Sequence, residues 1–488
     1  GQVVAVRAEA APSVAPVTAP APGSTQAATA SQAATVPQAS GATAANGSTV
    51  ATGAPGQVAP AVAGPTTALS PAPLVNAATG GEPAQAAGTA VVQRSEPDEI
   101  RVPAVLMVMP HMSTAGTDTG RVVTTFAVGL LATHAKRVDG LAMSMGANWV
   151  GQSLSGGQLA IGANVARGPA SGVQLAVGGN VVTGDLEGLQ GSVGINVARG
   201  AMSGAQLTVG GNIAGAALSG GQFSVGANIA GAGGVGGQFT VGANIAAAPM
   251  KGVQAAVGGN IASSFTGLQA STGLNFARGL QGAQVSLLNV GGDVDGAQVG
   301  LVNIAGKMDG LQLGLLNVAR HSDGEALGLL SFIGNGQANV QLWASDIAYT
   351  NVAVKFGSQH FHTLLTLGFN PGTDTHRRRY VAGAGFGTHI PAGRLFFDLD
   401  VVGSTVHADN LFRDGDGMNV LSQLRLVAGW QVVKRFALIG GVVGNTLVTW
   451  DNGDRWMELG IGPEWRSTAD NGRTTVRVWP GVLLGVQI

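Results

Sequence analysis

The chain has 488 residues, of which only 10% are charged and 5% aromatic while 79 are glycine, a composition far from that of an ordinary globular enzyme. Its formal net charge of −1 leaves no basic surplus for phosphates, so nucleic acid is excluded as an expected partner. The absence of cysteine excludes disulfides, thiolate metal sites and a cysteine nucleophile.

The sequence contains no uninterrupted run of about 18 apolar residues, so it predicts no membrane-spanning helix. A membrane-spanning β-barrel is still possible. The sequence begins at Gly1, and both a removed signal peptide and a fragment fit that start.

Residues 1–98 are built from Ala, Pro, Ser, Thr, Gly, Val and Gln and contain no aromatic residue. Such a segment cannot bury enough apolar surface to offset its ordering entropy, so it is expected to be a disordered arm. Charge appears at RSEPDEIR, and the run RVVTTFAVGLLATH is rich in β-branched residues. Residues 99–139 are therefore predicted to form a β lead-in or cap segment.

Residues 140–336 repeat one short unit, whose first residue is called the corner glycine here. Corner glycines occur every sixteen residues from Gly140 to Gly252, then every fifteen to Gly282, then every fourteen to Gly324, which makes twelve units. Two further series run alongside, and their regular members are Gln174, Gln190, Gln206, Gln222, Gln238 and Gln254, and Asn180, Asn196, Asn212, Asn228, Asn244 and Asn260. Self-similarity at a fixed period indicates a repeat architecture.

The sixteen- and fourteen-residue units have two equal halves, because the distance from Gly to Asn equals the distance from Asn to the next Gly, and the fifteen-residue units are one residue shorter in one half. Apolar and polar residues alternate within a half, which predicts a half-buried strand. Two strands and two corners make one turn of a two-sided parallel β-solenoid, with coils roughly 4.8 Å apart. Glycine is expected to supply positive φ at a corner, and stacked Gln and Asn amides should form ladders, with the direction of Asn left open.

The competing interpretation places the repeats in the wall of a transmembrane β-barrel. A half of seven or eight residues, turn included, is shorter than the roughly nine to eleven residues that a spanning strand needs. The turns between repeats are also all alike, whereas barrels alternate short turns with long loops.

Residues 337–488 contain six of the seven Trp and both Tyr, in about nine strand-like runs joined by turn sequences such as DNGD. An antiparallel β domain is predicted, either a small outer-membrane barrel with aromatic girdles or a soluble sandwich that caps the solenoid. The last coils carry an apolar contact row, which a neighbouring domain is expected to cover: Leu288, Val302, Leu316 and Leu330.

The stretch GAQVGLVNIAGKMDGLQLGLLNVA resembles the G-x-Q-x-G-x-x-N-x-A units of bacterial surface-repeat proteins of the cell envelope. The segments LGLLSFIGNG, SDIAYTNVAVKFG and FHTLLTLGF are similar to the stretch that succeeds the repeats in many of these proteins. The resemblance covers residues 140–450, and the sixteen-residue units depart from it by one added residue on each side. It implies an exported or outer-envelope β protein and no catalytic residues.

Few side chains suggest chemistry. His360 and His362 could ligate a metal from one face of a strand, but no third ligand lies nearby in the sequence. Asp414 and Asp416 lie in RDGDGMN, which lacks the downstream glutamate of a calcium loop. These four residues are weak metal candidates, and no cofactor, metal or catalytic residue is predicted.

The leading hypothesis is a non-enzymatic protein of the bacterial outer membrane or cell surface, in which a rigid solenoid spacer is anchored or capped by the β domain. Rows of Gln and small residues would face a partner, which would be an envelope protein, a polysaccharide or the outer membrane itself. The alternative is an outer-membrane barrel that acts as a channel or transporter, with the repeats as wall strands.

Overall fold

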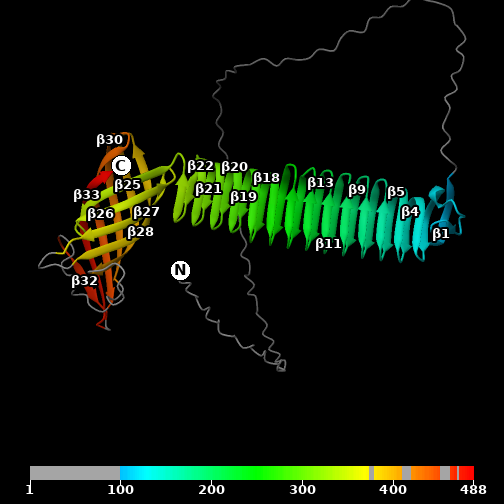
Figure 1. The fold of residues 1–488 in the computed structure, drawn as a ribbon, viewed down its shortest axis with the longest axis horizontal. Helices are drawn as coiled ribbons and strands as arrows, with labels where there is room; N and C mark the ends of the chain where they lie inside the picture. The colour runs from blue at the N-terminus through cyan, green and yellow to red at the C-terminus, as the bar shows by residue number, and fades with distance from the viewer. Residues whose placement is uncertain (1–98, 373–377, 409–418, 451–461, 470–471) are drawn as a thin grey trace, which may run out of the picture. The chain divides into compact units, whose positions relative to one another are not determined.

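The computed structural model describes residues 99–372, 378–408, 419–450, 462–469 and 472–488. These residues form a parallel β-solenoid and an antiparallel β-barrel, with one short 3-10 helix, η1 (Thr119–Arg121) (Figure 1). The predicted all-β fold class is confirmed. The proposed disordered arm and the loop that holds Asp414 and Asp416 lie outside the described residues.

The solenoid begins with β1 (Ile100–Met109), β2 (Met112–Ser113), β3 (Val122–Gly129), β4 (Ala132–Ser144) and β5 (Ala147–Ala160). The sixteen-residue units then supply β6 (Ala163–Ala166), β7 (Ala170–Ala176), β8 (Gly179–Val182), β9 (Leu186–Ser192), β10 (Ile195–Ala198), β11 (Met202–Thr208), β12 (Gly211–Ala214), β13 (Leu218–Ser224), β14 (Ala227–Ala230), β15 (Gly234–Thr240), β16 (Ala243–Ala246) and β17 (Met250–Ala256). The shorter units supply β18 (Gly259–Ser271), β19 (Leu274–Val285), β20 (Leu288–Val299), β21 (Val302–Leu313), β22 (Leu316–Ser322), β23 (Glu325–Leu327) and β24 (Leu330–Ile333).

Equivalent residues of successive coils lie side by side in parallel register. Gln206 of β11 pairs with Gln222 of β13, and Asn212 of β12 pairs with Asn228 of β14. Parallel pairing also joins β1 to β3 and β3 to β4, so stacked coils precede Gly140. Because the repeats pair in parallel with one another, they are not antiparallel wall strands of a barrel, and that alternative is wrong for the repeats.

The corner glycines from Gly156 to Gly310 adopt positive φ, as predicted, whereas Gly140 and Gly324 at the two ends of the series do not. Gly220 has φ +129°, and a Cβ placed on it would lie 2.0 Å from the carbonyl oxygen of Gly204 in the preceding coil. A side chain at this position would therefore meet both backbone strain and a backbone clash.

The Gln and Asn series point inward and form two buried ladders. Asn212 donates through Nδ2 to Oδ1 of Asn228 in the following coil, at 2.9 Å. Gln222 donates through Nε2 to Oε1 of Gln206 in the preceding coil, at 2.8 Å. The two amide ladders thus run in opposite directions along the solenoid. Both series are buried, so the expectation that the Gln rows face a partner is wrong.

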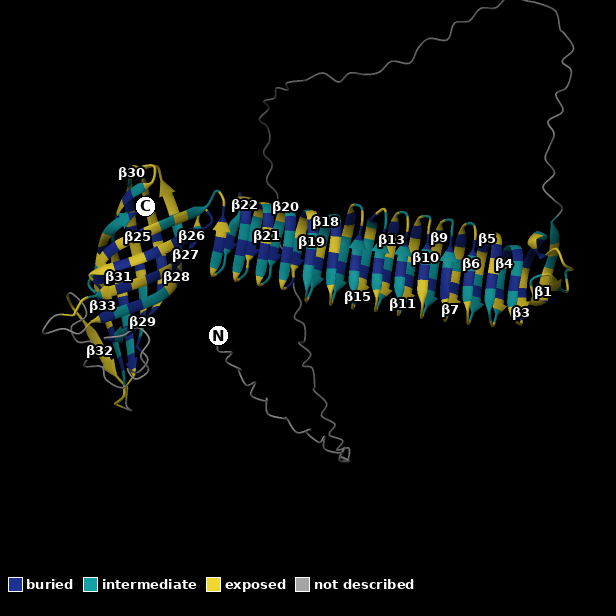
Figure 2. Cartoon of the chain, in the orientation of Figure 1, coloured by how far each residue is buried: buried dark blue, intermediate teal, exposed yellow. Residues whose placement is uncertain are grey.

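Aliphatic side chains fill the remaining interior between the two ladders. Met202 of β11 and Leu218 of β13 are buried, and so are alanines of the shorter strands, such as Ala230 of β14. Figure 2 shows buried residues in every coil of the solenoid. The Asn amides also tie coils together through the backbone, because Asn228 Nδ2 donates to the carbonyl of Phe239 in the next coil at 2.8 Å. The polar groups of the ladders therefore have partners along the solenoid, and the exceptions are Gln158 Nε2 and Gln312 Oε1 at the two ends of the Gln ladder.

The N-terminal coils carry a charged cluster around Glu99. Its carboxylate accepts hydrogen bonds from Lys136 (3.0 Å), Arg137 (3.1 Å) and Arg101 (2.6 Å). The hydrogen bond from Lys136 is the main cause that holds the pKa of Glu99 below its ordinary value. Nearby, burial lowers the pKa of His134, and electrostatic interactions with His111 and Arg167 lower it further.

The second sheet comprises β25 (Gln337–Ser345), β26 (Thr350–Gly357), β27 (Phe361–Asn370), β28 (Arg379–Ala392), β29 (Leu395–Ala408), β30 (Asn419–Val433), β31 (Phe436–Trp450), β32 (Trp465–Thr468) and β33 (Thr474–Gln487). Consecutive strands pair antiparallel, and β33 pairs with both β31 and β25, so the sheet closes on itself. The wall therefore has eight strands, and β32 pairs with the N-terminal part of β33. Of the two sequence-based options, the structure selects the barrel over the sandwich.

Candidate functional site: the barrel wall and its buried charges

The barrel strands place apolar residues outside and a mixture of polar, charged and apolar residues inside. Along β29, Leu395, Phe397, Leu399 and Val401 are exposed, while the residues between them are buried and include two aspartates. The same alternation runs along β30 and β33 and appears as alternating colours in Figure 2. This arrangement is the reverse of a protein that hides its apolar face from water.

The lumen contains a compact set of ionisable side chains at the level of Asp398. Lys355 Nζ donates to Asp398 Oδ2 at 2.6 Å, and His389 Nδ1 lies 2.6 Å from Asp398 Oδ1. Lys355 and Asp398 are both completely buried. One carboxylate thus serves two partners, one from β26 and one from β28, and it ties three strands together across the lumen.

A second acid, Asp400, lies two residues further along β29. His362 Nε2 is 2.8 Å from Asp400 Oδ1, and Arg425 Nε is 3.7 Å from Asp400 Oδ2. The Arg425 guanidinium also stacks over Trp343, 4.6 Å from the ring centroid. A charge that is removed from water needs such partners, because desolvating it alone is costly.

Towards the other end of the lumen, polar groups from distant strands meet again. Trp479 Nε1 donates to Asp346 Oδ2 at 2.8 Å, and Arg477 Nε donates to Glu464 Oε1 at 2.8 Å. Apolar side chains such as Leu421 and Leu447 lie between these groups. The described part of the lumen is therefore packed with side chains, as the width of an eight-stranded barrel permits.

The two ends of the barrel differ in the length of their connections. Tight turns join β26 to β27, β28 to β29 and β30 to β31 at the end where β25 begins and β33 ends. Three basic residues lie in these turns: Arg394, Lys434 and Arg435. The opposite end carries the longer connections 371–378, 409–418 and 451–464. The solenoid leads into β25 and therefore joins the end with the short turns.

Aromatic side chains mark both ends of the outer wall. Tyr349, Trp450 and Trp465 are exposed near the longer connections, and Phe397 and Trp430 are exposed near the short turns. Aromatic rings at two levels with aliphatic side chains between them are typical of barrels that sit in a bilayer.

The structure separates the two histidines that were weak metal candidates. His360 precedes β27 and lies 2.8 Å from Glu325 of the solenoid, whereas His362 points to Asp400 in the lumen. Among the residues that the structure describes, no group of three or more His, Cys, Asp or Glu side chains could hold a metal ion.

The predicted apolar contact row is half-buried: Leu288, Val302, Leu316 and Leu330 stack on one another in register. The neighbouring row, one residue earlier in each coil, is more exposed and lines a cavity together with barrel residues.

Sequence reasoning missed the lumen charges. Their signal is present in LFFDLDVVG, where the aspartates alternate with Leu and Val as they would on the inner side of a barrel strand.

Comparison with known proteins gives no relative: no family model, curated protein or solved structure matches the chain. The stacked ladders and the C-terminal barrel are present, while membership of a bacterial surface-repeat family stays a prediction. In the described ranges, no helix is both long and apolar enough to cross a membrane.

Proposed function

We propose that the protein is a non-enzymatic envelope protein, in which the C-terminal barrel inserts into a bilayer of the outer-membrane type and anchors the solenoid as a rigid rod. The observation that carries this proposal is the inverted barrel, with aliphatic residues outside and paired charges inside a closed eight-stranded wall. In water, such a barrel would expose its whole apolar wall. In lipid, the same wall is solvated by hydrocarbon, and backbone groups are satisfied by closure.

Strand length supports insertion. The strands β28 to β31 and β33 have 14 or 15 residues, more than the roughly nine to eleven that a tilted spanning strand needs, while β25, β26 and β27 have 9, 8 and 10. The C-terminal residues Val482, Leu484 and Ile488 are all exposed on the outer wall.

The ends of the barrel support an orientation. Outer-membrane barrels have short turns on the periplasmic side and long loops on the outside. The solenoid joins the end with the short turns, so the rod extends on the periplasmic side rather than from the cell surface.

An anchor fits this barrel better than a channel or transporter does. Lys355, Arg425 and Arg477 lie in the lumen almost without solvent exposure, and each takes part in an ion pair. Opening a path would separate these pairs and leave buried charges unpaired, which costs several kcal/mol. The buried ladders and parallel pairing make the solenoid a spacer that holds distance by its geometry. An envelope protein or polysaccharide as its partner stays a prediction.

The test is a pair of arginine substitutions on the outer wall of the full-length chain. Leu426 lies in the middle of β30 and is 51% exposed, whereas Val432 lies near the short turn and is 41% exposed. Leu426→Arg should cost roughly 2–4 kcal/mol of insertion free energy and Val432→Arg about 0–1, because the cost of a charge depends on depth in lipid. Folding into liposomes is measured by heat-modifiable gel mobility and by resistance to urea extraction.

A chain that stays soluble without detergent, is released from liposomes by urea, and tolerates both substitutions equally would refute insertion.

A further inference from the structure

Charge is confined to one part of every solenoid repeat. From Gly140 to Gly310, the ten residues that start at each corner glycine contain no Asp, Glu, Lys or Arg. The charges of the repeats, such as Arg167, Asp185 and Lys251, all lie in the remaining residues of the unit. One side of the solenoid is therefore uncharged over twelve successive units.

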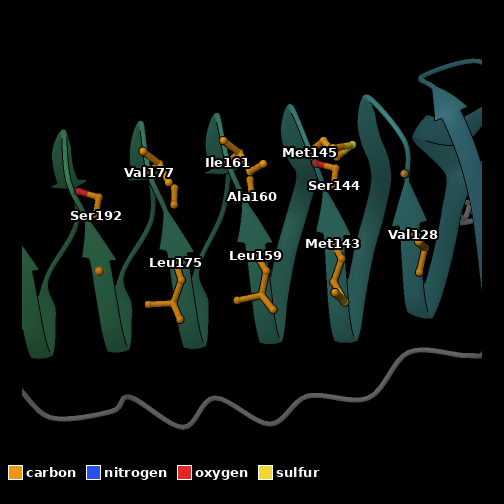
Figure 3. Close-up of a pocket in the computed structure, with 13 residues that line it drawn as sticks. Val128, Met143, Ser144, Met145, Leu159, Ala160, Ile161, Leu175, Val177 and Ser192 are labelled. Carbon is orange, nitrogen blue, oxygen red and sulfur yellow. The ribbon is translucent and has the colours of Figure 1, made fainter.

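An apolar trough runs along this uncharged side. One ridge is formed by the third residue after most corner glycines, as in Leu159 and Leu175, and it is low at Gly191, Ala255 and Ala270. The other ridge is formed by the fifth residue, as in Ile161 and Val177. The fourth residue, a Ser, Thr, Ala or Gly, forms the floor. Figure 3 shows both ridges with Ala160 between them, near the N-terminal end of the solenoid, where they enclose a shallow cavity of about 630 Å³.

Hydroxyl groups in the floor of the trough form hydrogen bonds with neighbouring coils. Thr208 Oγ1 donates to the carbonyl of Gly194 at 2.9 Å, and Thr240 Oγ1 donates to that of Gly226 at 3.0 Å. Ser224 donates to Thr240 Oγ1 at 2.9 Å. These hydroxyls have partners within the protein and add little polarity to the trough, whereas the hydroxyls of Ser144 and Ser271 in the floor have no hydrogen-bond partner in the described part of the chain.

A second and larger cavity, called the deep section here, lies on the same side beside the barrel and has a volume of about 1140 Å³. There the floor becomes Gly300, Gly314 and Gly328, and the fifth-position ridge becomes leucine, including Leu301 and Leu315. The floor stays glycine for a steric reason, because a Cβ on Gly314 would lie 2.4 Å from the carbonyl oxygen of Gly300.

The deep cavity opens on the outer wall of the barrel. Phe361 and Phe386 line it, Phe386 is 68% exposed, and Thr363 Oγ1 donates to the carbonyl of Gly328 at 2.6 Å. Along the same strands follow smaller hollows of about 320 and 220 Å³, which share Val352 and Leu367. The apolar surface is thus continuous from the solenoid to the outward face of β26–β28.

We propose that the trough binds the hydrocarbon chains of lipids, with its main binding site in the deep section at Leu301 and Leu315, and that it guides them to the barrel wall. The cavity walls offer apolar contacts and almost no hydrogen-bonding partner, which suits an aliphatic chain whose polar head stays in solvent. The guiding role rests on the proposed insertion of the barrel, since only then does the trough lead to bilayer lipid.

Two other occupants fit the surface less well. A bound peptide would need backbone partners, but the strands of the coils are already paired on both sides within the stack. A second copy could cover the uncharged side, but that would not explain why the larger cavity is shared with the barrel. Continuity with the barrel wall favours hydrocarbon.

The test uses the full-length protein in lipid nanodiscs and a photoactivatable palmitate analogue as the probe, with adducts mapped by peptide mass spectrometry. Adducts are expected on the trough residues of β19–β21. Leu315→Glu should lower this labelling about tenfold, and Leu315→Trp, which fills the trough without adding charge, should lower it similarly. Val235→Glu is the matched control and should leave labelling unchanged, because Val235 is an exposed apolar residue in the part of its unit that carries charges elsewhere, and it lines neither cavity of the trough.

Labelling that is spread evenly over both sides, or that survives both Leu315 variants in protein of native gel mobility, would overturn the proposal. So would a dimer by mass photometry that Leu315→Glu dissociates without any trough labelling, which would assign the surface to a second copy. If the barrel does not insert, the same labelling is measured on the protein in buffer. Adducts on the trough in buffer would support the binding site, although insertion and the guiding role would then be wrong. If no adducts form in buffer, the binding site is wrong as well.

Discussion

Replacement of Asn228 by alanine removes one amide from the middle of the Asn ladder. Asn228 Nδ2 donates to Asn244 Oδ1 (3.0 Å), to Phe239 O (2.8 Å) and to Gln222 O (3.2 Å), and its Oδ1 accepts from Asn212 Nδ2 (2.9 Å). Asn212 keeps two carbonyl acceptors within its reach, whereas Asn244 Oδ1 loses its donor in a buried site.

The expected cost follows from that asymmetry. An orphaned buried acceptor costs about 1–3 kcal/mol, and each lost hydrogen bond adds about 1 kcal/mol net. We therefore expect about 3 kcal/mol for opening the adjacent coils, which corresponds to roughly 100-fold faster exchange. Because each coil contacts only its neighbours, the effect should be confined to β12–β16.

Hydrogen–deuterium exchange of the full-length chain in nanodiscs, resolved by peptide, measures this opening free energy coil by coil. Ser219→Ala is the matched control, since Ser219 lies in the same region on the exposed surface. Exchange that accelerates less than threefold in Asn228→Ala, or equally in both variants, would refute the view that the buried ladder stabilises the coils.

Three further outcomes are expected. Gly220→Ala should speed exchange in β11–β15 far more than Gly393→Ala speeds it in the β28–β29 turn, because both glycines have positive φ but only Gly220 would bring a Cβ 2.0 Å from a carbonyl oxygen. The N-terminal coils should open more readily as the pH falls below about 6.5, because the folded state lowers the pKa of His134 and the unfolded state then binds more protons. His134→Gln should reduce this dependence of coil opening on pH, measured as hydrogen–deuterium exchange rates corrected for the intrinsic exchange rate at each pH. Asp398→Ala should lower barrel stability by roughly 3–5 kcal/mol, because Lys355 stays buried without its partner, and the double variant Lys355→Met with Asp398→Leu should recover much of that loss in the temperature of the gel-mobility shift.

Much of the solenoid could be predicted from residue spacing. Identical residues at a fixed period stack in register, so the parallel coils and the positive φ of the corner glycines follow from the spacing alone. The direction of Asn did not follow, because each corner resets the alternation of the chain and only the folded coil shows that Asn and Gln both turn inward. The prediction that rows of Gln lie on the surface was wrong for the same reason.

The sequence by itself determined the repeat architecture of this protein, because contacts between neighbouring coils are local and recur with the period. Only the tertiary structure decided that the C-terminal strands close into a barrel, since closure pairs β25 with β33 at the opposite end of the domain. It also decided which charges meet, because Lys355 and Asp398 are 43 residues apart and become partners only when β26 and β29 face one lumen. No local pattern encodes such a pair, whose stability depends on exclusion of water from a site that several strands build together.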